Sequence, residues 1–69
     1  MPLALANVGE ENIVKKVGGS SELRLHLQEM GFVPGAAVTV ITSLAGNVIV
    51  NVKETRVAIS EEMARRIMV

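Results

Sequence analysis

The 69-residue sequence contains no cysteine, tyrosine, tryptophan or aspartate, and Phe32 is its one aromatic residue. Without cysteine the chain can form no disulfide, and thiol catalysis, iron–sulfur ligation and cysteine-based zinc sites are excluded together. The scarcity of rings disfavours single-stranded nucleic acid as a ligand, because small barrels that bind it stack bases on several aromatic side chains. The 7 basic and 7 acidic side chains also cancel, which leaves no net field to attract a polyanion. Nucleic acid is therefore not an expected partner.

Long apolar runs are absent too. No run approaches the roughly 18 residues that cross a bilayer, and the first residues lack the basic segment of a signal peptide. We therefore expect a cytoplasmic protein with one domain over residues 1–69. A chain of this size buries only about 60% of its unfolded surface, yet 49% of its residues are hydrophobic. Part of this apolar surface is expected to face a partner or a second copy of the chain.

Short runs rich in β-branched residues dominate the rest of the sequence. Ser20 or Ser21 fits the N-cap of a helix inserted after the first of these runs, and Ser60 fits the N-cap of a second helix of about two turns. The runs are separated by turn residues at the spacing of a meander. They predict strands at residues 12–17, 37–42, 47–52, 55–59 and 67–69.

The end of the first predicted helix is the most informative segment. Leu23, Leu27 and Met30 recur at helical spacing, and Gly31 follows at the position where a helix can end in the left-handed conformation. In an ending of the Schellman type, the next residue contacts the one five positions earlier. The sequence therefore predicts a contact between Phe32 and Leu27.

A tight turn follows this helix, because Pro34-Gly35 fit the central positions of a type II turn. The segment M-G-F-V-P-G-A-A-V-T-V-I at residues 30–41 resembles the signature of the FeoA family, small cytosolic proteins of bacterial ferrous iron transport. Other family-like motifs occur in the same order and extend the resemblance over nearly the whole chain: V-G-E at 8–10, V-K-K-V-G-G at 14–19, G-N-V-I-V at 46–50, R-V-A-I at 56–59 and E-M-A-R-R-I-M-V at 62–69.

The order of the predicted elements describes an all-β fold with one inserted α-helix. It matches a small five-stranded SH3-like barrel with a short helical turn before the last strand. One segment departs from the resemblance, since Lys53-Glu54-Thr55 stand where many relatives carry a glycine. Neither Glu nor Thr favours the positive φ of a tight hairpin turn, so a wider or differently registered loop is expected there.

A metal site has little support in the sequence. His26 is the one histidine, and Glu22 and Glu29 stand four residues before it and three after it, so all three can share a helix face. Iron(II) accepts such nitrogen and oxygen ligands. A single histidine with two mobile carboxylates is nevertheless a loose, exposed site, and solvated helix faces often look like this. No cofactor is expected, and His26 and Glu29 are the weak candidates for Fe²⁺ or another divalent metal.

Catalysis is not expected. The serines at positions 20, 21, 43 and 60 all lie at predicted turns or caps, and none has an evident base and orienting group. The glycines do not have the spacing of a phosphate-binding or dinucleotide-binding loop.

The resemblance implies an accessory protein that acts by contact with FeoB, the membrane transporter with a cytosolic GTPase domain. A homodimer is a further expectation. A related barrel forms the C-terminal module of iron- and manganese-dependent repressors, so the alternative function is a metal-responsive regulatory domain.

The inserted helix is the expected docking element, because it stands apart from the strand ladder. At roughly 100° per residue, Leu25 lies about 160° from the mean direction of the buried stripe, so Arg24 and Leu25 are the expected contacts. A lone exposed leucine is common on protein surfaces. The alternative docking side is the one that carries Lys53, Arg56 and Arg65.

Overall fold

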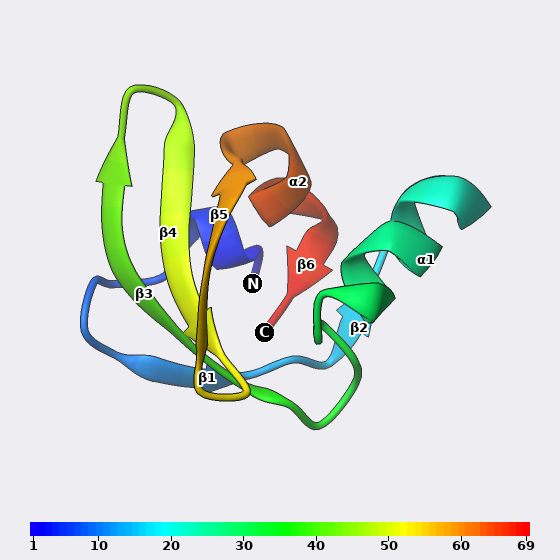
Figure 1. Cartoon of the computed structure of the whole chain (residues 1–69), viewed down its shortest axis with the longest axis horizontal. Helices are drawn as coiled ribbons and strands as arrows, with labels where there is room; N and C mark the ends of the chain where they lie inside the picture. The colour runs from blue at the N-terminus through cyan, green and yellow to red at the C-terminus, as the bar shows by residue number, and fades with distance from the viewer.

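Two antiparallel sheets form the fold in a computed structural model that describes residues 1–69 (Figure 1). The larger sheet has the order β1 (Glu11–Ile13), β3 (Ala37–Leu44), β4 (Asn47–Val52), β5 (Thr55–Ser60), and the smaller pairs β2 (Lys16–Val17) with β6 (Ile67–Met68). A 3₁₀ helix, η1 (Leu3–Leu5), packs beside α2 (Glu61–Arg66), while α1 (Ser21–Glu29) projects from one side of the barrel. The predicted mostly-β fold with one inserted helix is confirmed.

The first strand differs from its prediction. The sequence indicates one strand over residues 12–17, but the chain leaves the larger sheet after Ile13 and re-enters as β2 of the smaller sheet. Val14, at the bend, is 1% exposed, and its N–H donates to the Ala36 carbonyl at 2.9 Å. Because one segment serves both sheets, the structure has six strands rather than five.

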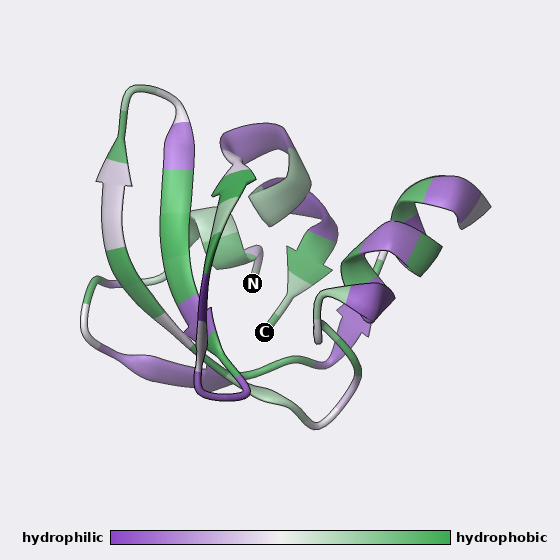
Figure 2. Cartoon of the chain, viewed as in Figure 1, coloured by the Kyte–Doolittle hydropathy of each residue, from purple (hydrophilic) through white to green (hydrophobic).

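One apolar core is formed by residues of both sheets. The hydrophobic segments of β3, β4 and β6 that contribute to it are green in Figure 2. Alternate side chains of β4 point into the core, so Val48, Val50 and Val52 are all buried. No polar or charged residue is buried. The core consists of Leu3, Val14, Leu27, Phe32, Val38, Val40, Val48, Val50, Val52, Ile59, Ala64, Ile67 and Val69.

The N-terminal segment contributes to the core in a way that the strand pattern did not predict. Leu3 in η1 is fully buried, and the backbone N–H of Val69 donates to the Met1 carbonyl at 2.8 Å. The two ends of the chain therefore lie side by side, with Pro2 bridged to Met68.

Both predicted helix N-caps are confirmed. The Ser20 hydroxyl accepts from the Leu23 N–H at 3.1 Å, and the Ser60 hydroxyl accepts from the Met63 N–H at 3.2 Å. Each bond satisfies one of the backbone donors that the first turn of a helix leaves free.

The turn between β4 and β5 corrects the prediction of a wider loop. Val52 pairs with Thr55, so the connection has only two residues, Lys53 and Glu54. Their φ angles are +50° and +63°, respectively, which is the left-handed pair of a type I′ hairpin. The twist of the paired strands outweighs the preference of Lys and Glu for negative φ, because a two-residue turn keeps twisted strands paired only in the I′ or II′ conformation. The cost for a non-glycine residue in this region is about 1–2 kcal/mol.

Replacing Glu54 with glycine is expected to stabilise the protein by about 1 kcal/mol. Glycine removes the strain of positive φ, but this gain is partly offset because glycine loses more backbone entropy on folding. In a domain of this size, the melting temperature should rise by about 4–8 °C in a thermal melt. Thr55→Gly is the control and should lower the melting temperature, since Thr55 lies in β5 and its hydroxyl donates to the Lys53 carbonyl at 3.5 Å. An unchanged or lower melting temperature for Glu54→Gly would contradict the strain argument.

Candidate protein-binding groove beside α1

The C-terminal end of α1 has the geometry that the sequence predicted. The Phe32 N–H donates to the Leu27 carbonyl, the Gly31 N–H donates to the Gln28 carbonyl, both at 3.0 Å, and Gly31 has a φ of +107°. These are the two hydrogen bonds of a Schellman ending. They direct Phe32 into the core, where it is 1% exposed.

The following turn brings the chain back to the barrel. The Ala36 N–H donates to the Val33 carbonyl at 3.0 Å, and Gly35, the third residue of the turn, has a φ of +92°. Both features agree with the predicted type II turn. The Gly35 N–H also donates to the Val14 carbonyl at 2.8 Å, so the turn is bonded to the segment that leads into β2.

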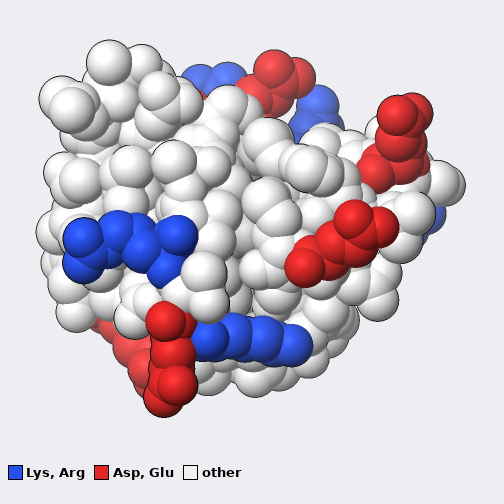
Figure 3. All heavy atoms as spheres, viewed as in Figure 1, with Lys and Arg blue, Asp and Glu red and all other residues white.

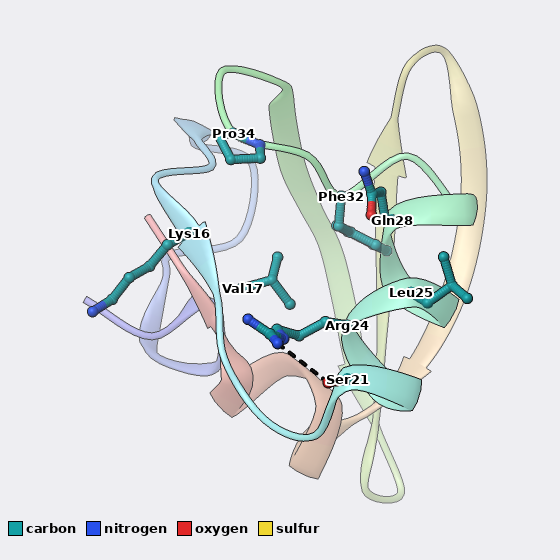
Figure 4. Close-up of a pocket in the computed structure, with 8 residues that line it drawn as sticks. All are labelled: Lys16, Val17, Ser21, Arg24, Leu25, Gln28, Phe32 and Pro34. Carbon is teal, nitrogen blue, oxygen red and sulfur yellow. Dashed lines mark hydrogen bonds between the residues drawn. The ribbon is translucent and has the colours of Figure 1, made fainter.

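A groove of about 550 Å³ lies between α1 on one side and β2 with the Pro34 turn on the other (Figure 4). Arg24 extends from α1 across this groove toward Val17, and the Phe32 side chain lies at its inner end. None of the lining residues is acidic. They are Lys16, Val17, Ser21, Arg24, Leu25, Gln28, Phe32 and Pro34.

The α1 helix presents three different faces. Leu27 is fully buried, whereas Leu25 is 56% exposed, which agrees with its predicted place on the wet side. Glu22 and Glu29 are exposed as well, and acidic side chains gather over α1 on the face seen in Figure 3. At 3.6 residues per turn, Arg24 lies about 160° around the helix from Glu22. The carboxylates of α1 therefore lie away from Arg24, on the side of the helix next to Leu25.

The alternative docking side is not assembled as expected. Lys53 lies at the β4–β5 turn and Arg56 follows at the start of β5, while Arg65 lies in α2, beyond the far end of that strand. Arg65 is also engaged within its own helix, where its guanidinium donates to the Glu61 carboxylate at 2.8 Å. The structure brings together Arg24 and Leu25, but does not bring Arg65 to the other two basic residues.

The weak metal candidates, His26 and Glu29, are exposed on α1. The structure contains no group of three or more His, Cys, Asp or Glu side chains arranged to hold a metal ion. Metal binding, and with it the metal-responsive alternative, stays a prediction. Calorimetric titration with Fe²⁺ under anaerobic conditions tests it.

Comparison with known proteins decides the family. The FeoA domain model matches residues 1–69. The chain belongs to the FeoA family. It is 40% identical over 68 residues to a Methanocaldococcus jannaschii protein described as a candidate Fe(2+) transport protein A, and the match covers 99% of this chain and 83% of that protein. The resemblance seen in the sequence motifs is thereby confirmed.

Solved structures of FeoA proteins share the fold. A crystal structure of an iron uptake regulatory protein, FeoA, is 33% identical and superposes with a TM-score of 0.91, covering 99% of this chain and 92% of that one. The zinc complex of FeoA from Stenotrophomonas maltophilia, described as a prokaryotic SH3 domain protein, has 24% identity and a TM-score of 0.86 over 99% of this chain and 87% of its own. The SH3-like class predicted from the sequence is therefore correct. The helices of this FeoA-family chain are all too short to span a membrane.

Part of the groove was not predicted from the sequence. The period of α1 indicated Arg24 and Leu25, but Lys16, Val17 and Pro34 on the opposite wall were assigned only to a strand and a turn. Their only sequence signal is indirect: a helix inserted between two consecutive strands must leave the barrel at the end of the first and rejoin it at the start of the second.

Proposed function

We propose that this chain is a cytosolic accessory protein of ferrous iron transport, which acts by contact with a FeoB-type membrane transporter and carries out no catalytic step. Membership of the FeoA family and the similarity to an Fe(2+) transport protein support the iron-transport context. The observation that carries the mode of action is the α1 groove, where an exposed leucine and an arginine stand together on a projecting helix.

The α1 helix suits a docking role because its attachment to the barrel is narrow. Leu27 is buried, and Leu23 and Met30 are partly buried against the core, so one stripe holds the helix in place. The remaining faces are free to contact a partner without disturbing the strand ladder. Arginine is also enriched among the residues that dominate binding energies at protein interfaces.

The direct experiment is a pull-down with the cytosolic part of the FeoB-type transporter from the same organism, paired with iron uptake in a deletion strain. Retention of the transporter fragment and reduced uptake on deletion are the expected results. Absence of binding together with normal uptake would remove the proposed function.

Leu25→Glu is expected to abolish this association while leaving the fold intact, because Leu25 is 56% exposed and surface substitutions usually change stability by less than about 0.5 kcal/mol. Leu44→Glu is a matched control, since Leu44 is 72% exposed at the end of β3. Pull-down and thermal melts of both variants check the prediction. Equal binding by a folded Leu25→Glu variant would place the contact outside α1.

A further inference from the structure

The charge and polarity of the α1 groove indicate what kind of segment fits it. Two of its lining residues, Lys16 and Arg24, are cationic and none is acidic. Val17 and Leu25 supply its apolar surface, and the buried Phe32 closes its inner end. Glu22 and Glu29 do not line the groove and lie away from Arg24, next to the groove's outer edge at Leu25. The groove therefore combines positive charge with apolar surface, whereas the chain as a whole is formally neutral.

Arg24 is the residue best placed to recognise a negative group. The one hydrogen bond of its side chain is donated to the Ser21 hydroxyl at 3.4 Å, and the ion pair between Arg65 and Glu61 is the only one in the structure. The donors of its guanidinium are thus largely available, and their planar arrangement matches a carboxylate in a two-pronged contact. Arg24 extends toward Val17 on the opposite wall of the groove (Figure 4), so a segment whose carboxylate binds Arg24 also has apolar surface within the same groove.

We propose that this groove binds a short acidic segment of the transporter's cytosolic part, in which a carboxylate pairs with Arg24. Neighbouring apolar side chains of the segment pack on Val17 and, at the outer edge of the groove, on Leu25. The inference rests on the proposed function and adds to it the chemistry of the partner segment. A lone inorganic anion would leave the apolar wall unused, and a purely apolar segment would bury Arg24 without a counter-charge.

The test measures binding of the transporter's cytosolic part to the wild-type protein and to two charge-reversal variants by calorimetry. Arg24→Glu is expected to weaken binding about tenfold or more, because like charges would then face each other. Arg56→Glu makes the same change of charge on β5, away from the groove, and should keep the affinity within about twofold. Thermal melts confirm that both variants are folded, which is expected since both arginines are exposed.

Overlapping peptides of the same cytosolic part then locate the segment. The peptides that bind are expected to contain Asp or Glu next to an apolar residue, and binding should weaken as salt rises from about 0.1 M to about 1 M, where the Debye length falls from about 10 Å to about 3 Å. Replacing that acidic residue with lysine should abolish binding to the wild-type protein and restore it to Arg24→Glu. Such a reciprocal rescue would assign the contact to this pair of charges.

The outcomes separate this inference from the proposed function. If the transporter fragment binds and Arg24→Glu binds equally well, the groove is not its docking site, although the function stands. If Arg24→Glu instead abolishes concentration-dependent self-association in sedimentation, and the fragment does not bind, the groove belongs to a second copy of the chain. If neither the fragment nor any peptide binds the wild-type protein, this inference is overturned, and the proposed function is overturned with it when the deletion strain takes up iron normally.

Discussion

Replacing Leu27 with alanine is expected to lower the free energy of unfolding by about 2–5 kcal/mol, the range measured for large-to-small substitutions at fully buried positions. Leu27 is 0% exposed and is the one fully buried side chain of α1. Its loss leaves a cavity between the helix and the barrel. For a chain of 69 residues, the whole stability is expected to be about 3–10 kcal/mol, so the variant should be close to unfolding.

Urea unfolding followed by circular dichroism measures this effect, with Leu25→Ala as the matched control. The control shortens a leucine in the same way, but at an exposed position two residues before Leu27. It should change the free energy of unfolding by less than about 0.5 kcal/mol. A similar midpoint for both variants would show that α1 is not anchored through Leu27.

Gly31→Val should also destabilise the protein strongly, and more than Gly35→Val. Both glycines have positive φ, +107° and +92°, so valine at either position costs about 1–3 kcal/mol in backbone strain. The surroundings differ, however. A Cβ at Gly31 would meet the Lys53 side chain at 3.4 Å and the Val52 side chain at 3.6 Å, whereas a Cβ at Gly35 would meet nothing within 4 Å. The branched side chain therefore adds crowding to strain only at Gly31.

Thermal melts of the two valine variants and of Gly31→Ala separate these causes. Gly31→Ala and Gly35→Val should both melt below the wild type, and Gly31→Val should melt lowest or fail to fold. If both valine variants melt at the wild-type temperature, the assigned turn geometry is wrong. If the two valine variants lower the melting temperature equally, the Val52 and Lys53 side chains move aside without cost.

These two predictions also concern the candidate site. Leu27 and Gly31 set how α1 leaves the barrel, and the groove exists because α1 stands opposite β2. A partly folded variant that keeps the barrel but releases α1 should lose the groove together with the proposed binding to the transporter. Leu25 and Arg24 can instead be changed without loss of the fold, because both are exposed. Stability and binding are therefore expected to depend on different residues of the same helix.

What the sequence determined by itself is local. Ser20 and Ser60 mark helix N-caps, Gly31 marks the helix end and Pro34-Gly35 mark the turn, because each depends on hydrogen bonds and dihedral angles within a few residues. The period of α1 likewise separated Leu27 from Leu25, since one amphipathic helix faces one core. The order of these local signals was also sufficient to indicate the FeoA family.

Only the tertiary structure decided the features that depend on pairing between segments far apart in the sequence. Whether residues 12–17 form one strand or two depends on which sheet each half joins, and Val14 bends between partners that are far away in sequence. Lys53 and Glu54 adopt positive φ because the twist of the joined strands selects a primed turn over their local preference. The groove required the same long-range information, since Arg24 and Val17 line one groove only when β2 pairs with β6 and α1 packs through Leu27.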